Sequence, residues 1–249
     1  MTNKHNLPQK ALWSVLLLGT LATLSTSAGS YTITIPGSVS FPLAWSFQPT
    51  NVAAAFPAPD NFTTLYFWDP SAGNYVENDY ISGYGWTDPN YVIANGIGFY
   101  YANPSSQEKT LTVSGVNVSA SSVTYTFQAG KAYFLGSAYL QPSNNGNYIE
   151  CVSKPPGPPY TDSTLSYSFN YGDKIYRWDD GNSNWTGGIR STNYCGGPAS
   201  PFWQVIGGTC SQWAFGDYQS ANIFIGHGFW YYPVANTNWT QHSTESSCP

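Results

Sequence analysis

The chain has 249 residues, of which 17% are aromatic and only 8% are charged, and its formal net charge is −5. Its few Lys and Arg residues form no basic cluster, so the composition argues against nucleic acid or an anionic membrane as a partner. Abundant Gly, Pro, Asn, Ser and Thr beside the aromatic residues favour strands joined by turns.

Residues 1–28 have the organisation of a secretory signal peptide. Lys4 and Lys10 precede a mostly apolar run over residues 11–24, and a small-x-small cleavage pattern ends at Ala28. The run is short for a bilayer span, so we expect cleavage after Ala28, no later membrane insertion, and release to the extracellular space or the periplasm. Loss of the leader leaves six basic and thirteen acidic residues, a net charge of −7.

The chain carries two aromatic segments twice. Gly96–Tyr101 corresponds to Gly226–Tyr232, and Thr64–Asp69 corresponds to Lys174–Asp179. Self-similarity at this spacing predicts an internal duplication. The predicted units are a signal peptide (1–28), a first β repeat (29–116), a connecting strand or linker (117–127) and a second β repeat (128–249).

Period-two alternation and turn residues predict the elements of the first repeat. In chain order they are a strand at 31–35, a strand at 41–49, a helical turn at Val52–Ala55, a strand at 63–68, a turn at 69–74, a returning strand at 75–81, and strands at 96–101 and 109–113. Residues 116–127 favour a strand, because Val123, Tyr125 and Phe127 are spaced two apart. The predicted fold is all-β, an antiparallel sandwich or barrel-like architecture with almost no helix after the signal peptide.

The second repeat is enlarged and holds all four cysteines, three of them in the enlargements and Cys248 in the tail. Trp68 and Gly96 are 28 positions apart, whereas Trp178 and Gly226 are 48 apart. An exported chain permits disulfides, and three pairings of four cysteines are possible. We favour Cys195 with Cys210 and Cys151 with Cys248, because the first bridge closes a local loop and the second ties an insertion to the tail.

The repeat motifs also resemble a known group of proteins. The residues that carry the resemblance are Leu65, Tyr66, Trp68, Gly85, Trp86, Gly96, Gly98, Phe99 and Tyr100, echoed by Ile175, Tyr176, Trp178, Trp213, Gly226, Gly228, Phe229 and Trp230. The arrangement resembles uncharacterised exported bacterial proteins built from two tandem aromatic- and Gly-rich β repeats. The resemblance implies a fold and export, and it implies no activity.

Aromatic residues are the candidate ligand contacts. In Gly226–Tyr232, alternation sends aromatic rings to both faces of a strand, and the favoured interpretation is core packing. Flat rings that stack on sugars are expected where side chains are exposed. The candidate binding residues lie in or beside the enlarged loops of the second repeat, where function tends to concentrate: Trp185, Tyr194, Trp203 and Trp213.

The sequence offers little for catalysis. The mature chain keeps only His227 and His242, and no nucleophile elbow, zinc-protease motif or phosphate loop is present. Asp180, Asn182 and Asn184 invite a calcium interpretation, but a hairpin turn explains them more simply. We therefore predict no catalytic residues, metal or cofactor.

Three functions remain in order of preference. The first is a secreted non-catalytic binding module for polysaccharide or surface glycan. The second is a structural cell-surface or matrix protein that self-associates. The third is a glycoside hydrolase, which needs two facing carboxylates that nothing in the sequence pairs.

Overall fold

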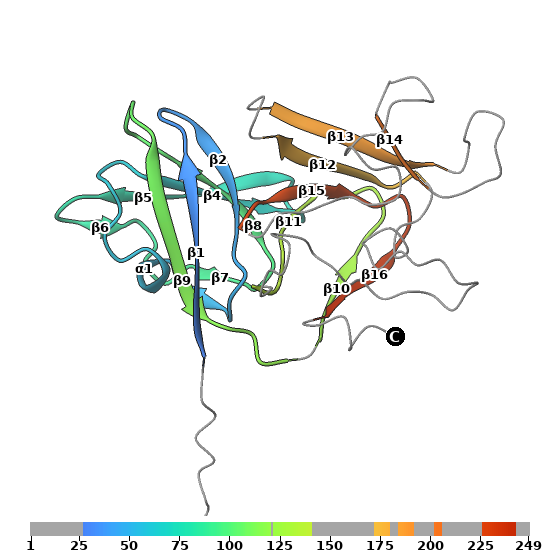
Figure 1. Ribbon diagram of the computed structural model, residues 1–249, viewed down its shortest axis with the longest axis horizontal. Helices are drawn as coiled ribbons and strands as arrows, with labels where there is room; N and C mark the ends of the chain where they lie inside the picture. Colours follow the sequence, from blue (N-terminus) through green and yellow to red (C-terminus); the bar gives the residue numbers. More distant parts are fainter. Residues whose placement is uncertain are drawn as a thin grey trace, which may run out of the picture.

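The computed structural model describes residues 27–120, 122–140, 172–179, 184–191, 202–205 and 226–242. In these ranges the regular secondary structure is antiparallel β-strand apart from one short helix (Figure 1). The first half contains β1 (Ala28–Ile35), β2 (Ser40–Ala44), β3 (Thr50–Asn51), the helix α1 (Val52–Ala55), β4 (Thr64–Asp69), β5 (Asn74–Ile81), β6 (Gly85–Trp86), β7 (Val92–Ile93), β8 (Gly98–Ala102) and β9 (Lys109–Val116). The second half contains β10 (Ser122–Phe127), β11 (Tyr133–Leu135), β12 (Lys174–Asp179), β13 (Asn184–Ser191), β14 (Phe202–Val205), β15 (Phe229–Tyr232) and β16 (Thr237–His242).

The first half packs a two-stranded ribbon on a five-stranded sheet. The sheet has the order β2-β8-β4-β5-β6, and the ribbon β1–β9 crosses it in Figure 1. Period-two alternation sends Leu65 and Phe67 of β4 into the core, where both are almost fully buried. Ile35 and Val113 of the ribbon are buried in the same hydrophobic cluster. The result is a sandwich-like layer pair.

The second half has the same strand order. Its sheet runs β11-β15-β12-β13-β14, and its ribbon is β10–β16. Position by position these strands match β2, β8, β4, β5 and β6 and the ribbon β1–β9. Phe127 of the ribbon meets Tyr231 of the sheet with ring centroids 5.0 Å apart, and Trp239 meets Phe229 at 5.6 Å. Aromatic rings therefore fill the second core.

Local chemistry explains the short elements. Asn51 caps α1 by accepting a hydrogen bond from Ala54 N at 2.8 Å, so the predicted helical turn is confirmed. Asp69 ends β4 and accepts bonds from Ser71 N at 2.7 Å and Ala72 N at 3.1 Å, which fixes the predicted hairpin turn into β5. The all-β antiparallel prediction is confirmed, and the open sheets match its sandwich alternative.

The two halves cover each other's sheet edges. Leu43 of β2 bridges to His227, and Leu135 of β11 bridges to Ile97, at equivalent positions of the two halves. Ala44 N donates to Gly226 O at 2.9 Å, and Gly136 N donates to Gly96 O at 2.9 Å. Each half therefore uses the residues just before its own β8 or β15 to occupy the outer edge of the other half's β2 or β11.

Glycine makes this exchange possible. A Cβ on Gly228 would lie 2.7 Å from Leu43 O, and a Cβ on Gly98 would lie 2.9 Å from Leu135 O. Gly226 has φ +79° and faces the ring of Tyr31, while Gly96 has φ +68° and faces the hydroxyl of Tyr125. The Gly-x-Gly motif thus marks the surface on which the halves dock.

Several predictions fall outside the described residues. Cys151, Cys195, Cys210 and Cys248 all lie there, so both disulfides stay predictions. None of the helices in the described part of the chain has the length and apolarity needed to cross a membrane.

Candidate functional site

The outer faces of the two five-stranded sheets carry a second set of aromatic rings. Tyr66 and Trp68 alternate on β4 with the buried Leu65 and Phe67, so they point away from the core. Trp230 and Tyr232 alternate in the same way on β15. These rings form one connected set, which we call the aromatic cluster: Tyr66, Trp68, Tyr75, Tyr100, Phe134, Tyr176, Trp178, Trp185, Trp230 and Tyr232.

The base of the cluster is buried and comes from both halves. Phe134 and Trp230 stack with centroids 4.7 Å apart and planes 11° apart. Trp68 meets Trp230 edge to face at 5.2 Å, and Tyr100 lies 4.8 Å from Phe134. The indole of Trp68 also donates to Ala132 O at 2.8 Å. Packed rings with satisfied donors make a rigid support for whatever lies above them.

The rim of the cluster is exposed. Tyr75 of β5 is 40% exposed and Tyr232 of β15 is 37% exposed, whereas Trp230 between them is 8% exposed. The hairpin register places Tyr75 opposite Trp68, with ring centroids 5.1 Å apart. Two tyrosines from different halves therefore present their rings to solvent on one support.

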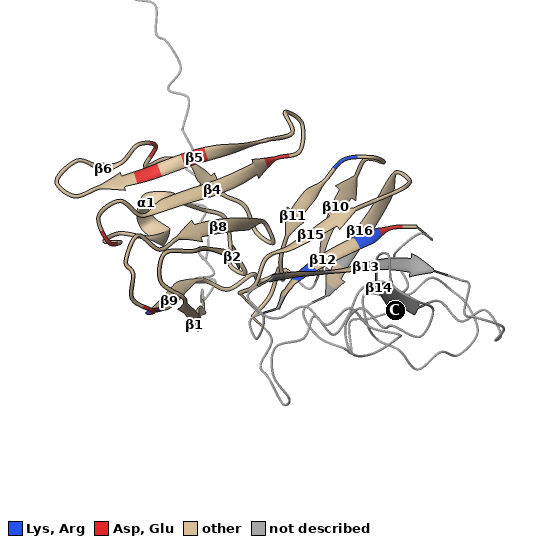
Figure 2. Ribbon diagram, turned by 90° about the horizontal axis from the view of Figure 1, so that it is seen from above, with Lys and Arg blue, Asp and Glu red and all other residues tan. Residues whose placement is uncertain are grey.

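Polar groups border these rings. Glu77 follows Tyr75 on the same face of β5, and Lys174 is the cross-strand partner of Tyr232. Figure 2 marks few other Lys, Arg, Asp and Glu positions on the coloured strands of the two sheets. The surface thus offers rings, hydroxyls and a few charges at its margin.

Burial favours the neutral form of the Tyr100 and Tyr232 hydroxyls by raising the pKa of each. Tyr100 accepts a bond from the Trp230 indole N–H at 3.2 Å and also bonds the Tyr75 hydroxyl. Burial raises the pKa of Tyr100, the Trp230 bond lowers it in part, and the neighbouring Tyr75 and Tyr232 raise it again. Burial, followed by nearby Tyr176 and Tyr75, likewise raises the pKa of Tyr232. Neutral hydroxyls both donate and accept, as sugar hydroxyls require.

One of the four predicted binding residues lies in this cluster. Trp185 is half-buried, with its ring 5.5 Å from Trp178, 6.1 Å from Phe134 and 6.2 Å from Tyr100. It stands opposite Trp178 on strand β13, which begins at Asn184. The backbone of Trp203 pairs with Arg190 in the β13–β14 ladder. Tyr194, Trp213 and the side chain of Trp203 lie outside the described residues.

Sequence reasoning missed the rim residues Tyr75 and Tyr232. A signal for Tyr75 was present, since a hairpin over 64–81 with its turn at 69–74 places this residue directly opposite Trp68. No comparable signal placed Tyr232 nearby, because its proximity depends on how the two halves dock.

Comparison with known proteins leaves the site to be judged on its own chemistry. The chain matches no protein-family model, no curated protein sequence and no solved structure.

Proposed function

We propose that this chain is an exported, non-catalytic binding protein that recognises carbohydrate through the aromatic cluster. The observation that carries the proposal is the pair of exposed rings, Tyr75 and Tyr232, on a buried base shared by both halves. Aromatic faces pack against the C–H faces of pyranose rings, and bordering polar groups bond the hydroxyls. A rigid support reduces the ordering cost of binding.

The proposal includes export and internal duplication. The basic and apolar leader over residues 1–28 supports export, and the identical strand order of the two sheets supports duplication. Cleavage after Ala28 removes Ala28, which pairs with Val116, and the Ser27 carbonyl that accepts from Asn117 N, and it leaves the β1–β9 ladder from Gly29 onward intact. N-terminal sequencing of exported protein is expected to begin at Gly29.

The test is a polysaccharide and glycan binding screen on the mature protein. Tyr75→Ala and Tyr232→Ala are expected to abolish retention, because each removes an exposed ring while leaving the buried base. Tyr84→Ala is the matched control, since Tyr84 is 90% exposed on the turn between β5 and β6 and is not part of the cluster. Trp185→Ala is expected to weaken retention, because it removes a ring that packs against Phe134 and Tyr100 in the cluster. Trp203→Ala tests the other predicted binding residue on the β11-β15-β12-β13-β14 sheet.

Two results would contradict the proposal. One is a mature protein that no polysaccharide or glycan surface retains. The other is equal loss of retention in Tyr84→Ala and Tyr75→Ala, because that would place the contact outside the cluster. Tyr75→Phe separates the two contributions, since it keeps the ring and removes only the hydroxyl.

A further inference from the structure

Strand β9 has one edge that pairs with no other strand in the described part of the chain, which we call its open edge. It pairs only with β1 among the described strands, and the hydrogen bond from Asn117 N to Ser27 O at 2.9 Å extends that ladder by one residue. In an antiparallel ladder, hydrogen-bonded and non-hydrogen-bonded pairs alternate. The N–H and C=O groups of Thr110, Thr112 and Ser114 therefore point away from β1.

Two contacts agree with this alternation. The hydroxyl oxygens of Thr32 and Thr112 lie 3.3 Å apart, as expected for a non-hydrogen-bonded pair, whose side chains approach closely. Val116, two residues beyond Ser114, uses its outward C=O to accept from Gln48 N at 2.8 Å. Among the described residues, the outward backbone groups of Thr110, Thr112 and Ser114 have no such backbone partner.

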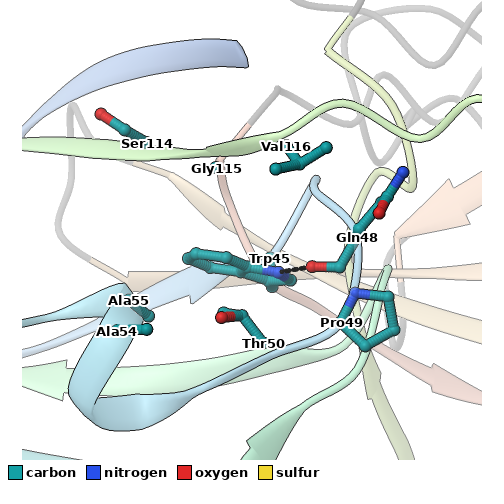
Figure 3. A pocket seen from close by; sticks show the side chains of 9 residues that line it. All are labelled: Trp45, Gln48, Pro49, Thr50, Ala54, Ala55, Ser114, Gly115 and Val116. Carbon is teal, nitrogen blue, oxygen red and sulfur yellow. Dashed lines mark hydrogen bonds between the residues drawn. The ribbon is translucent and has the colours of Figure 1, made fainter. Parts of the chain in front are cut away.

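A groove runs along the open edge, formed by two adjoining hollows. The first, of about 170 Å³, lies between Ser114–Val116 of β9 and Ala54–Ala55 of α1, with the indole of Trp45 beside it (Figure 3). The second, of about 240 Å³, lies between Lys109–Thr112 of β9 and the segment 55–59. Ala55 borders both hollows, so they adjoin.

The walls of the groove are more apolar than polar, with Gln48, Thr50 and Ser114 as the polar side chains of the first hollow. Trp45 turns its only polar ring atom to its own chain, donating to Gln48 O at 2.8 Å. Phe56, two prolines and Leu111 line the second hollow. The one cation there, Lys109, is paired with Asp60 at 2.6 Å. The groove therefore favours uncharged, apolar side chains.

We propose that the open edge of β9 accepts an extended peptide segment of a partner protein as an added strand, with two apolar side chains in the hollows. Backbone donors and acceptors that alternate along an edge are matched by another extended backbone. Leu111 lines the second hollow and Gly115 the first, and the four residues of strand between them span about 13 Å. The partner's apolar side chains accordingly stand at positions i and i+4, on one face of its strand.

The chain already makes the first bond of such a strand. Gln48 N bonds Val116 O, and the Gln48 side chain donates to Asn117 O at 3.1 Å, before Pro49 directs the chain away. The partner's extended segment would pair with β9 from the point at which Pro49 leaves it. A second copy of this chain fits less well, because α1 and residues 55–59 flank the same edge and would meet their counterparts in the other copy. The inference is independent of carbohydrate binding at the aromatic cluster.

The probe is the peptide acetyl-Lys-Val-Thr-Leu-Ser-Thr-Thr-Leu-Lys-amide, whose leucines are four residues apart. Its control has the same composition with leucines three apart, so that they face opposite sides of a strand. Amide hydrogen exchange is measured by NMR on the mature protein. At a peptide concentration about ten times its Kd, exchange at Thr110, Thr112 and Ser114 is expected to slow by roughly tenfold. The control peptide is expected to cause no slowing.

Thr112→Pro removes an outward N–H and is expected to abolish this protection. Thr32→Pro is the matched control. It loses the same hydroxyl contact, and the outward N–H that it removes lies on β1 rather than on β9. It is expected to bind the peptide as the unmodified protein does. Should Thr112→Pro fail to fold, Ala54→Leu decides the question, since it fills the first hollow from an exposed position without altering β9.

The proposal is overturned by any of four results. The first is unchanged exchange at all three amides at millimolar peptide. The second is equal protection by both peptides, and the third is equal loss of binding in Thr32→Pro and Thr112→Pro. Concentration-dependent dimerisation that Thr112→Pro abolishes would assign the edge to a second copy and would also overturn it.

Discussion

Gly226→Ala tests the docking of the two halves directly. Gly226 has φ +79°, and a Cβ there would lie 2.5 Å from a ring carbon of Tyr31. That ring is held by the hydroxyl of Tyr31, which donates to Ala44 O at 2.6 Å, and by stacking on Phe47 at 5.9 Å. It has little freedom to move aside, so both backbone strain and overpacking are expected.

The two costs are separable with a control. Left-handed backbone at a non-glycine residue costs about 1–2 kcal/mol, and overpacking adds about 1–3 kcal/mol. Gly83→Ala carries only the first cost, because Gly83 has φ +86° and a Cβ there would have no neighbour within 4 Å. Gly226→Ala is therefore expected to lower the free energy of unfolding by about 1–3 kcal/mol more than Gly83→Ala.

Thermal and urea unfolding of the mature protein measure this difference. For a chain of this size each kcal/mol lowers Tm by about 2–4 °C. In a Tyr31→Ala background the added methyl has room, so Gly226→Ala is expected to cost no more there than Gly83→Ala does. Equal destabilisation by Gly226→Ala and Gly83→Ala in the unmodified protein would refute the docking argument.

Three further predictions concern ionisation and polar contacts. Burial raises the pKa of Tyr139 to about 12 and also raises that of Tyr100 above the unfolded value of about 10. Their contribution is complete below about pH 10 and lost as the pH rises above it, so tyrosinate absorbance and unfolding are expected to rise together in strong alkali. Asp60→Asn removes the ion pair with Lys109. Because the Asp60 side chain is 53% exposed and that of Lys109 24%, the free energy of unfolding in urea is expected to change by less than about 1 kcal/mol. Asn95→Ala removes donors to a carbonyl in each half, at 3.0 and 2.7 Å, and is expected to cost about 1–3 kcal/mol by the same measurement.

Much of the fold was predictable because strands have a short period and turns have distinctive residues. The alternation in Thr64–Asp69 and the turn chemistry of Asp69 locate a hairpin without knowledge of the tertiary structure. Alternation in Gly226–Tyr232 separates two aromatic faces, yet both are apolar, so the pattern alone does not say which face lies in the core. Tertiary packing decides it, placing Phe229 and Tyr231 inside and Trp230 in the aromatic cluster.

The candidate site was predictable only in part. Trp185 was expected in or beside an enlarged loop, and it lies on strand β13, one residue after the strand begins. Tyr75 and Tyr232 are far apart in sequence and approach because the two halves dock. The recurrence of Gly-x-Gly indicated a shared structural role, but local sequence holds no sign that Gly98 approaches Leu135 or that Gly228 approaches Leu43.

The exchange of sheet edges also bears on the order in which the chain is completed. The outer edge of β2 is covered by residues 226–228, which come much later in the chain. The turn at Gly96 likewise packs against the hydroxyl of Tyr125, which is synthesised after it. A chain that leaves the ribosome or a translocation channel from its N-terminus presents the first sheet long before its cover arrives. Completion of the first half is therefore tied to arrival of the last strands, and a prematurely terminated chain exposes a bare β2 edge that invites aggregation.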